Sequence, residues 1–300
     1  MSFSFRQYLV SLKESGNAVK QWVQGERATA ADIRVALKFV SEHTEIPVQE
    51  LQDNLLGSTN HTLAGKQNDS GDVDIAIPAD KYDVQEIIAK LKEAVNNEVS
   101  FATGLKTYSF AIPVGNDRKI QVDLMIVNSK DWATFAYNTP PTSKYKGVVR
   151  NQILFAVVTQ HIEPGKDVVV KNEEGQVIAR ASRSLKFDTG IERLFKIAPL
   201  MKNGKRKKTL EKVSPDVLKS ELEKIDLKLK FDPTSDPIND PVRAAEWMFG
   251  KGTKPEDIDT AEKVIQLIKT KFKPTDRDEI IDQAIKNLED NHLPVPEELK

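Results

Sequence analysis

The chain has 300 residues, of which 39% are hydrophobic and 30% are charged, and its formal net charge is −1. This balance excludes a strong global field toward nucleic acid or a membrane, so such a partner would need a local patch. The lack of Cys excludes disulfides, thiolate catalysis and Cys-ligated zinc, and it is typical of the cytoplasm, where we expect the protein. No apolar run reaches the roughly 18 residues of a membrane span, and the N-terminus predicts an amphipathic helix rather than a signal peptide.

The first half of the chain predicts a mixture of helices and strands. Apolar spacing predicts helices over 4–24 and 29–43, and an apolar stretch then leads, as a strand, to Gly57 and Ser58. Alternation and turn residues next predict a strand at 72–78, a helix at 81–97, and strands at 99–104, 106–115 and 118–128.

The second half predicts a helix at 144–161 and then a hairpin at 166–182 with its turn at Glu173–Gly175. Helices are expected over the rest of the chain, at 185–200, 214–225, 240–250, 257–272 and 275–291. The predicted fold class is therefore α+β. We expect a mixed-sheet core with its N-terminal helices and hairpin over 1–183, followed by a helical C-terminal domain over 184–300.

Aspartates follow the same alternation in two of the predicted strands. In "DVDIAIP" Asp72 and Asp74 point to one face while the intervening apolar residues point to the other, and "KIQVDLMIV" places Asp123 in the same way. If the two strands are neighbours, three carboxylates converge on one surface, where they repel unless cations lie between them. Carboxylate oxygens suit Mg²⁺ or Mn²⁺, although a pair of acids on a strand is also common on a plain solvated face.

A Gly-Ser pair before the first of these strands favours the metal site. Gly57 allows a phosphate to approach the backbone closely, and Ser58 offers a hydroxyl at the start of a following helix. Among the four histidines none has metal-ligand spacing, and no Walker A or dinucleotide-binding motif is present.

Together "GS", "DVDIAI" and "VDLMI" resemble the DNA polymerase β-type nucleotidyltransferase superfamily over about residues 50–127. The layout also resembles stand-alone nucleotidyltransferase-like proteins of phages. The resemblance implies a mixed-sheet core flanked by helices that moves a nucleoside monophosphate from an NTP to an acceptor hydroxyl. It implies that Asp72 and Asp74 hold Mg²⁺ or Mn²⁺ shared with the triphosphate, and that Asp123 helps to hold the ion that activates the acceptor.

Basic residues follow the third aspartate in "SKYKGVVRNQIL". Lys146 and Arg150 are spaced to share a helix face, with Lys144 just before them, and we expect these three to bind the nucleotide together with Gly57 and Ser58. The alternative is a helix start with solvated charges.

A second basic cluster lies in "MKNGKRKKTLEKV". Lys205, Arg206, Lys207 and Lys208 are candidates to grip the backbone of RNA or DNA, which favours a nucleic-acid 3′ end as acceptor. A solvated loop is the plainer interpretation. The other functions left open are a toxin or defence factor of the nucleotidyltransferase type, an enzyme that nucleotidylates proteins or small molecules, and a non-catalytic nucleotide-binding protein.

Overall fold

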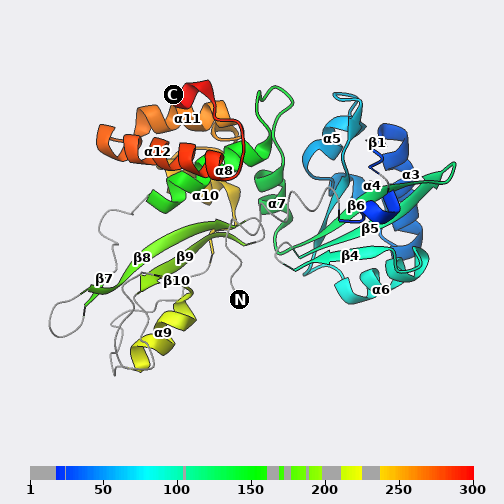
Figure 1. Ribbon diagram of the computed structural model, residues 1–300, viewed down its shortest axis with the longest axis horizontal. Coiled ribbons are helices and arrows are strands. Elements are labelled where there is room, and N and C mark those ends of the chain that lie inside the picture. The colour runs from blue at the N-terminus through cyan, green and yellow to red at the C-terminus, as the bar shows by residue number, and fades with distance from the viewer. Residues whose placement is uncertain are drawn as a thin grey trace. The chain divides into compact units, whose positions relative to one another are not determined.

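The computed structural model describes residues 18–23, 25–103, 106–160, 169–171, 177–186, 189–197, 211–224 and 237–300. The chain divides into two compact units, Met1–Val148 and Val149–Lys300. The boundary predicted after residue 183 lies further along the chain. In the structure the predicted helix at 144–161 and the hairpin after it therefore fall almost entirely in the second unit (Figure 1).

The first unit contains a mixed four-stranded sheet in the order β3-β6-β5-β4, so the predicted α+β class is confirmed. Strands β3 and β6 are parallel, whereas β6–β5 and β5–β4 are antiparallel. A short ribbon of β1 and β2 stands apart from this sheet. The elements of this unit are α2 (Lys20–Val23), β1 (Ala28–Thr29), α3 (Ala30–Thr44), α4 (Val48–Asp53), α5 (Gly57–Leu63), β2 (Asp69–Ser70), β3 (Val73–Pro78), α6 (Val84–Ala94), β4 (Val99–Ala102), β5 (Thr107–Gly115), β6 (Arg118–Val127) and α7 (Lys130–Tyr137).

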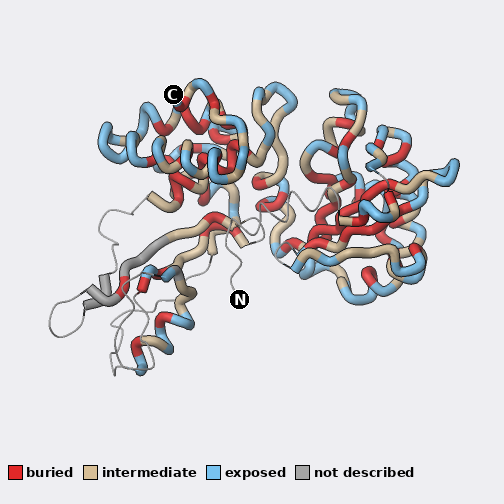
Figure 2. Tube along the Cα trace, in the orientation of Figure 1, coloured by how far each residue is buried: buried red, intermediate tan, exposed pale blue. Residues whose placement is uncertain are grey.

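One face of this sheet forms the core of the unit. Ile75 of β3, Val122 and Leu124 of β6, and Phe110 of β5 are all fully buried against apolar residues of α3 and α6. Figure 2 shows buried positions following these strands. Burial of one such side chain contributes roughly 1.5–3 kcal/mol, so packing of this face holds the strands together.

Helix α3 begins at a capping box. The Thr29 hydroxyl accepts from the Asp32 backbone N–H at 3.3 Å, and the Asp32 carboxylate accepts from the Thr29 backbone N–H at 2.9 Å. Arg118 of β6 adds an ion pair to Asp32 at 3.3 Å. These contacts fix the start of α3 beside the β1–β2 ribbon.

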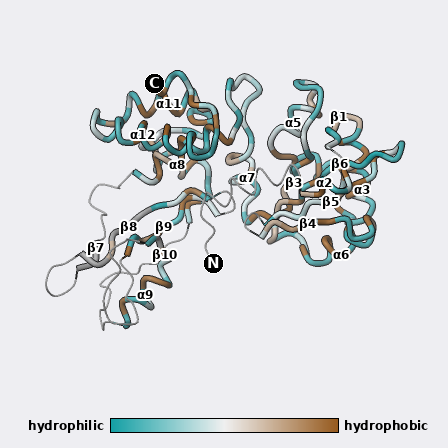
Figure 3. The backbone as a smooth tube through the Cα atoms, viewed as in Figure 1, coloured by the Kyte–Doolittle hydropathy of each residue, from teal (hydrophilic) through white to brown (hydrophobic). Residues whose placement is uncertain are grey.

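The second unit combines helices with an antiparallel four-stranded sheet in the order β10-β9-β8-β7. Figure 3 shows hydrophilic and hydrophobic positions mixed along α11 and α12, as expected for helices that bury one face. The elements are α8 (Gly147–Gln160), β7 (Val169–Lys171), β8 (Val177–Lys186), β9 (Gly190–Ile197), β10 (Glu211–Val213), α9 (Pro215–Glu223), α10 (Pro241–Phe249), η1 (Pro255–Asp257), α11 (Ala261–Lys271), α12 (Pro274–Asp290) and η2 (Glu297–Leu299).

The predicted helix over 185–200 is wrong, because β8 and β9 pair there as a hairpin. Buried Phe195 and Ile197 alternate with exposed Lys196, which is the period of a strand. Gly190 has φ +90°, and a Cβ on it would stand 2.1 Å from the backbone oxygen of Ile238, so only glycine fits at the start of β9. The C-terminal part is therefore not purely helical.

Two other differences lie in the first unit. The stretch predicted as a strand before Gly57 is helix α4 over Val48–Asp53, and only its end is extended, where Leu55 forms an isolated antiparallel bridge with Ile75. Helix α7 was not predicted, although Ser129 caps it by accepting from the Trp132 N–H at 3.2 Å.

The other predicted elements occur near their expected positions, and the hairpin at 166–182 is confirmed by the pairing of β7 with β8. Its turn, and most of the predicted first helix, lie outside the described residues. In the part of the chain that the structure describes, no helix has the length and apolarity to cross a membrane.

The Asp32 contacts predict a pH-dependent stability. Burial alone would raise the pKa of Asp32, but hydrogen bonds from Thr29 and the charge of Arg118 outweigh it and lower the pKa. A lowered pKa in the folded state stabilises the fold above the unfolded-state pKa, and this stabilisation is lost as the pH falls through the folded-state pKa. At pH 7, Asp32→Asn should therefore lower the free energy of unfolding by about 1–3 kcal/mol.

Urea unfolding at a series of pH values checks this expectation. The gap between wild type and Asp32→Asn should narrow as the pH falls below about 4. The exposed residue Asp80 offers a matched control, Asp80→Asn, which should change little. A gap that keeps its size at acid pH would contradict the role given to Asp32.

Candidate metal and nucleotide site

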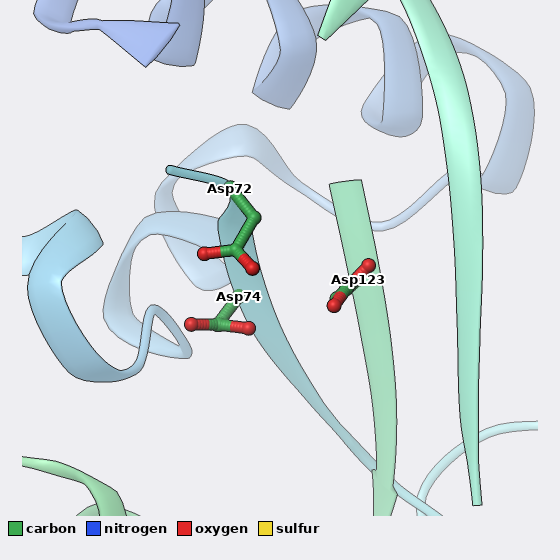
Figure 4. A group of neighbouring side chains, drawn as sticks. All are labelled: Asp72, Asp74 and Asp123. Atoms are coloured by element: carbon green, nitrogen blue, oxygen red, sulfur yellow. The ribbon is translucent and has the colours of Figure 1, made fainter. Parts of the chain in front are cut away.

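Asp72, Asp74 and Asp123 lie together on the side of the first unit's sheet opposite its apolar core (Figure 4). Asp74 of β3 is the register partner of Asp123 of β6, and Asp72 directly precedes β3. One carboxylate oxygen from each residue lies within 4.8 Å of the others. The predicted convergence of the three carboxylates is therefore confirmed.

The convergence follows from the apolar alternation on the other side of the sheet. Val73, Ile75 and Ile77 of β3 are fully buried, as are Val122 and Leu124 of β6. Burying these side chains leaves the intervening aspartates on the opposite face, because successive side chains of a strand point to opposite faces. A one-residue slip between the strands would expose the core residues, so packing also specifies the register of the carboxylates.

The cluster is electrostatically strained in the absence of a cation. Burial raises the pKa of Asp74 well above its usual range, and the charges of Asp72 and Asp123 raise it further. Burial and the charge of Asp72 likewise raise the pKa of Asp123. Such groups resist carrying full negative charge together unless a positive charge compensates them.

Asp123 is also held by neighbouring polar side chains. It is 1% exposed, and the Gln121 Nε2 donates to both of its carboxylate oxygens, at 3.0 and 3.2 Å. Hydrogen bonds from Ser109 and Gln121 lower the pKa of Asp123, though less than burial raises it. Gln121 was visible in the strand pattern, but its contact with Asp123 depends on side-chain geometry that the pattern did not show.

Two cations act on the carboxylate of Asp72. Burial raises the pKa of Asp72, and the charges of Arg27 and Lys146 partly offset this effect. Lys146 is exposed, as is Lys144, and both precede α8. Lys146 was among the predicted nucleotide-binding residues, whereas Arg27 was missed because it lies far upstream in sequence.

Gly57 and Ser58 begin helix α5 beside the carboxylates. Gly57 has φ +59°, and a Cβ on it would stand 3.2 Å from Asp74 Oδ2, so a side chain here would crowd the cluster. Its backbone N–H donates to Asn138 Oδ1 at 2.7 Å. The Ser58 hydroxyl is 2.7 Å from that of buried Ser70, and Ser58 as a whole residue is exposed.

Thr59 ties α5 to the strand that carries the carboxylates. Its hydroxyl donates to the backbone oxygen of Asp72 at 3.3 Å and accepts from the backbone N–H of Asp74 at 3.1 Å. Thr59 is fully buried. The position of the Gly57-Ser58 pair relative to Asp72 and Asp74 is therefore set by direct hydrogen bonds.

Arg150 does not share an exposed face with Lys146, and that expectation is wrong. Helix α8 begins after Lys146, and Arg150 is 1% exposed within the second unit. Its Nη1 donates to the Asp259 backbone oxygen at 3.1 Å, and its Nε and Nη2 donate to Asn151 Oδ1 at 3.2 and 3.0 Å. Burial lowers the pKa of Arg150 to about 10. The hydrogen bond to Asp259 links α8 to the segment before α11, so Arg150 has a structural role within the second unit.

The predicted nucleic-acid grip at Lys205, Arg206, Lys207 and Lys208 lies outside the described residues. It therefore stays a prediction from sequence.

The three carboxylates fit hard divalent cations. They supply only oxygen ligands, at a separation that one or two ions can bridge, and among the described residues none of the three forms a salt bridge with a basic side chain. Asp72, Asp74 and Asp123 would therefore hold Mg²⁺ or Mn²⁺.

Comparisons of the chain with family models, with curated proteins and with solved structures find no match. Functional assignment therefore depends on the residues of the site.

Because the three carboxylates repel one another, removing one should stabilise the metal-free fold and weaken metal binding. Asp74→Asn removes one of three like charges, so without metal it should raise the free energy of unfolding by roughly 1 kcal/mol or more, the energy of one pKa unit. Added Mn²⁺ should stabilise the wild type and should stabilise this variant much less.

Thermal unfolding with and without Mn²⁺ measures both effects. Asp80→Asn, in the turn after β3, removes a charge of the same kind away from the cluster and should behave as wild type. Equal Mn²⁺ stabilisation of wild type and Asp74→Asn would show that the cluster does not bind the ion.

Proposed function

We propose that the protein is a metal-dependent nucleotidyltransferase that moves a nucleoside monophosphate from an NTP to an acceptor hydroxyl. The observation that carries the proposal is the convergence of Asp72, Asp74 and Asp123 from two adjacent strands, with Gly57 packed against Asp74. The same residues and spacing underlie the resemblance to the DNA polymerase β-type superfamily. The site combines a cation cradle with a close backbone approach, which is what binding of a metal-bound triphosphate requires.

Each residue then has a stated part in the reaction. When bound, the divalent cations would offset charge on the triphosphate and favour ionisation of the acceptor hydroxyl. The three aspartates hold those cations, with Gln121 orienting Asp123. Gly57 keeps a side chain away from Asp74, where the phosphate would bind, and Ser58 would offer its hydroxyl to that phosphate.

The proposed transfer is a nucleophilic substitution at the α-phosphorus of the NTP. The acceptor oxygen bonds to the α-phosphorus, the bond between that phosphorus and the bridging oxygen breaks, and pyrophosphate leaves. The proton of the acceptor hydroxyl passes to water. Lys146 contributes positive charge beside Asp72, where negative charge is concentrated.

Nucleotidyltransferases of this kind differ in the acceptor that receives the nucleoside monophosphate. A nucleic-acid 3′ end is our first choice because of the basic cluster at 205–208, although the net charge of the whole chain is only −1. The same site chemistry would serve an enzyme that nucleotidylates a protein or a small molecule. It would also serve a toxin or defence factor of the nucleotidyltransferase type.

Incubation with each labelled NTP and with cellular RNA, DNA and protein, with and without Mg²⁺, tests the function. Label should enter one pool only when Mg²⁺ is present, and that pool identifies the acceptor. Asp74→Asn should lower the rate at least about a hundredfold, the scale of losing one preorganised electrostatic contact, while Asp80→Asn should not. NTP binding without transfer to any pool would support a non-catalytic nucleotide-binding protein and would contradict the proposal.

The basic cluster makes a separate prediction about the acceptor. If it grips single-stranded nucleic acid, affinity should fall with salt at a log–log slope of about −0.7 per phosphate contact. Changing Lys205, Arg206, Lys207 and Lys208 together to Ala should flatten that slope and leave NTP binding unchanged. Parallel salt curves for variant and wild type would point to another acceptor-binding surface.

A further inference from the structure

Arg27 is positioned beside the carboxylate cluster by the β1–β2 ribbon. It immediately precedes β1, whose Ala28 and Thr29 are the register partners of Ser70 and Asp69 in β2. The Arg27 Nε donates to Asp69 Oδ1 at 2.6 Å. Asp72 lies just beyond the end of β2, so the ribbon brings an upstream cation to the start of the strand that carries the site.

The guanidinium of Arg27 lies close to the backbone just before Asp72. Its Nη1 lies 3.7 Å from where a Cβ on Gly71 would stand, directly next to Asp72 in sequence. Its charge acts on the Asp72 carboxylate more strongly than that of Lys146. Within the described part of the chain only its Nε makes a side-chain hydrogen bond, which leaves both Nη groups able to donate to a ligand.

The ion pair between Arg27 and Asp69 contributes little to the stability of the fold. The side chains are 60% and 40% exposed, and ion pairs this exposed contribute little to the free energy of unfolding. The pair does position the guanidinium, because the Asp69 carboxylate accepts from its Nε, and the Arg27 backbone is held separately by Arg118, whose Nη2 donates to the Arg27 oxygen at 3.5 Å. This arrangement orients a cation at low cost in stability.

A bound triphosphate would carry more negative charge than the metal ions can offset, so a further cation near the site would stabilise it. Two divalent ions would offset the three carboxylates with one positive charge to spare, whereas a triphosphate brings about four negative charges. Arg is the side chain best suited to phosphate, because its planar fork donates two parallel hydrogen bonds. Among the described residues, Arg27 and Lys146 are the cations whose charges lower the pKa of Asp72.

We propose that Arg27 is a substrate-binding residue that donates its Nη groups to the triphosphate of the nucleotide held at the Asp72, Asp74 and Asp123 cluster. This assignment rests on the proposed function. The ribbon also holds Ser70 against Ser58, at 2.7 Å between the two hydroxyls, so the same ribbon contacts Ser58 and carries Arg27.

Binding of inorganic tripolyphosphate in Ca²⁺, followed by calorimetry, tests the assignment without depending on the base or on turnover. Arg27→Ala should bind tripolyphosphate about tenfold to a hundredfold more weakly than wild type, the range for a hydrogen bond to a charged group. Arg27→Lys should be intermediate, because it keeps the charge and loses the fork. Arg34→Ala, which removes another exposed arginine from α3, should bind as wild type.

Two further readouts separate substrate binding from a structural role. The unfolding midpoint of Arg27→Ala should stay close to that of wild type, and Mn²⁺ should bind this variant at least as tightly, because a positive charge near Asp72 has been removed. In the transfer assay KM for the NTP should rise more than kcat falls. Equal tripolyphosphate affinity in Arg27→Ala and wild type would overturn the assignment and leave the proposed function standing. A wild type that binds Mn²⁺ but neither tripolyphosphate nor any NTP would overturn both.

Discussion

Mutual repulsion among three carboxylates is the constraint on which the site of the first unit depends. Asp72, Asp74 and Asp123 place oxygens within 4.8 Å of one another on a sheet face where burial raises the pKa of each. The opposite face supplies the compensation, because its fully buried apolar side chains hold β3 and β6 in the register that brings the acids together. The unit thus uses core packing on one face to maintain an electrostatically unfavourable arrangement on the other.

Helix α5, the β1–β2 ribbon and Gln121 are positioned around the three carboxylates by specific contacts. Helix α5 is fixed to the strand backbone by Thr59, and glycine at position 57 avoids crowding Asp74. The β1–β2 ribbon brings Arg27 to one side, and Gln121 braces Asp123 from within the sheet. These contacts hold the carboxylates in a defined geometry, which the proposed binding of cations and a triphosphate would need.

Local patterns in the sequence predicted the alternating strands, and from them the shared face of Asp72, Asp74 and Asp123. Contacts between distant segments were harder to predict. Arg27 reaches the site only through a two-residue strand pairing, and no nearby motif indicates it. Arg150 has helical spacing from Lys146, yet its contact with Asp259, a long way downstream, buries it in the second unit. At 185–200 the apolar residues suit either a helix or a strand, and the pairing of β8 with β9 from Gly190 onward decides for a strand.

The most direct measurement of the central claim is a crystal structure of the protein soaked with Mn²⁺ and a non-hydrolysable NTP, with the ions located by anomalous scattering. The account predicts Mn²⁺ between the carboxylates of Asp72, Asp74 and Asp123, with triphosphate oxygens completing the coordination next to Gly57. Mn²⁺ and nucleotide bound elsewhere, with the carboxylates binding neither, would contradict it.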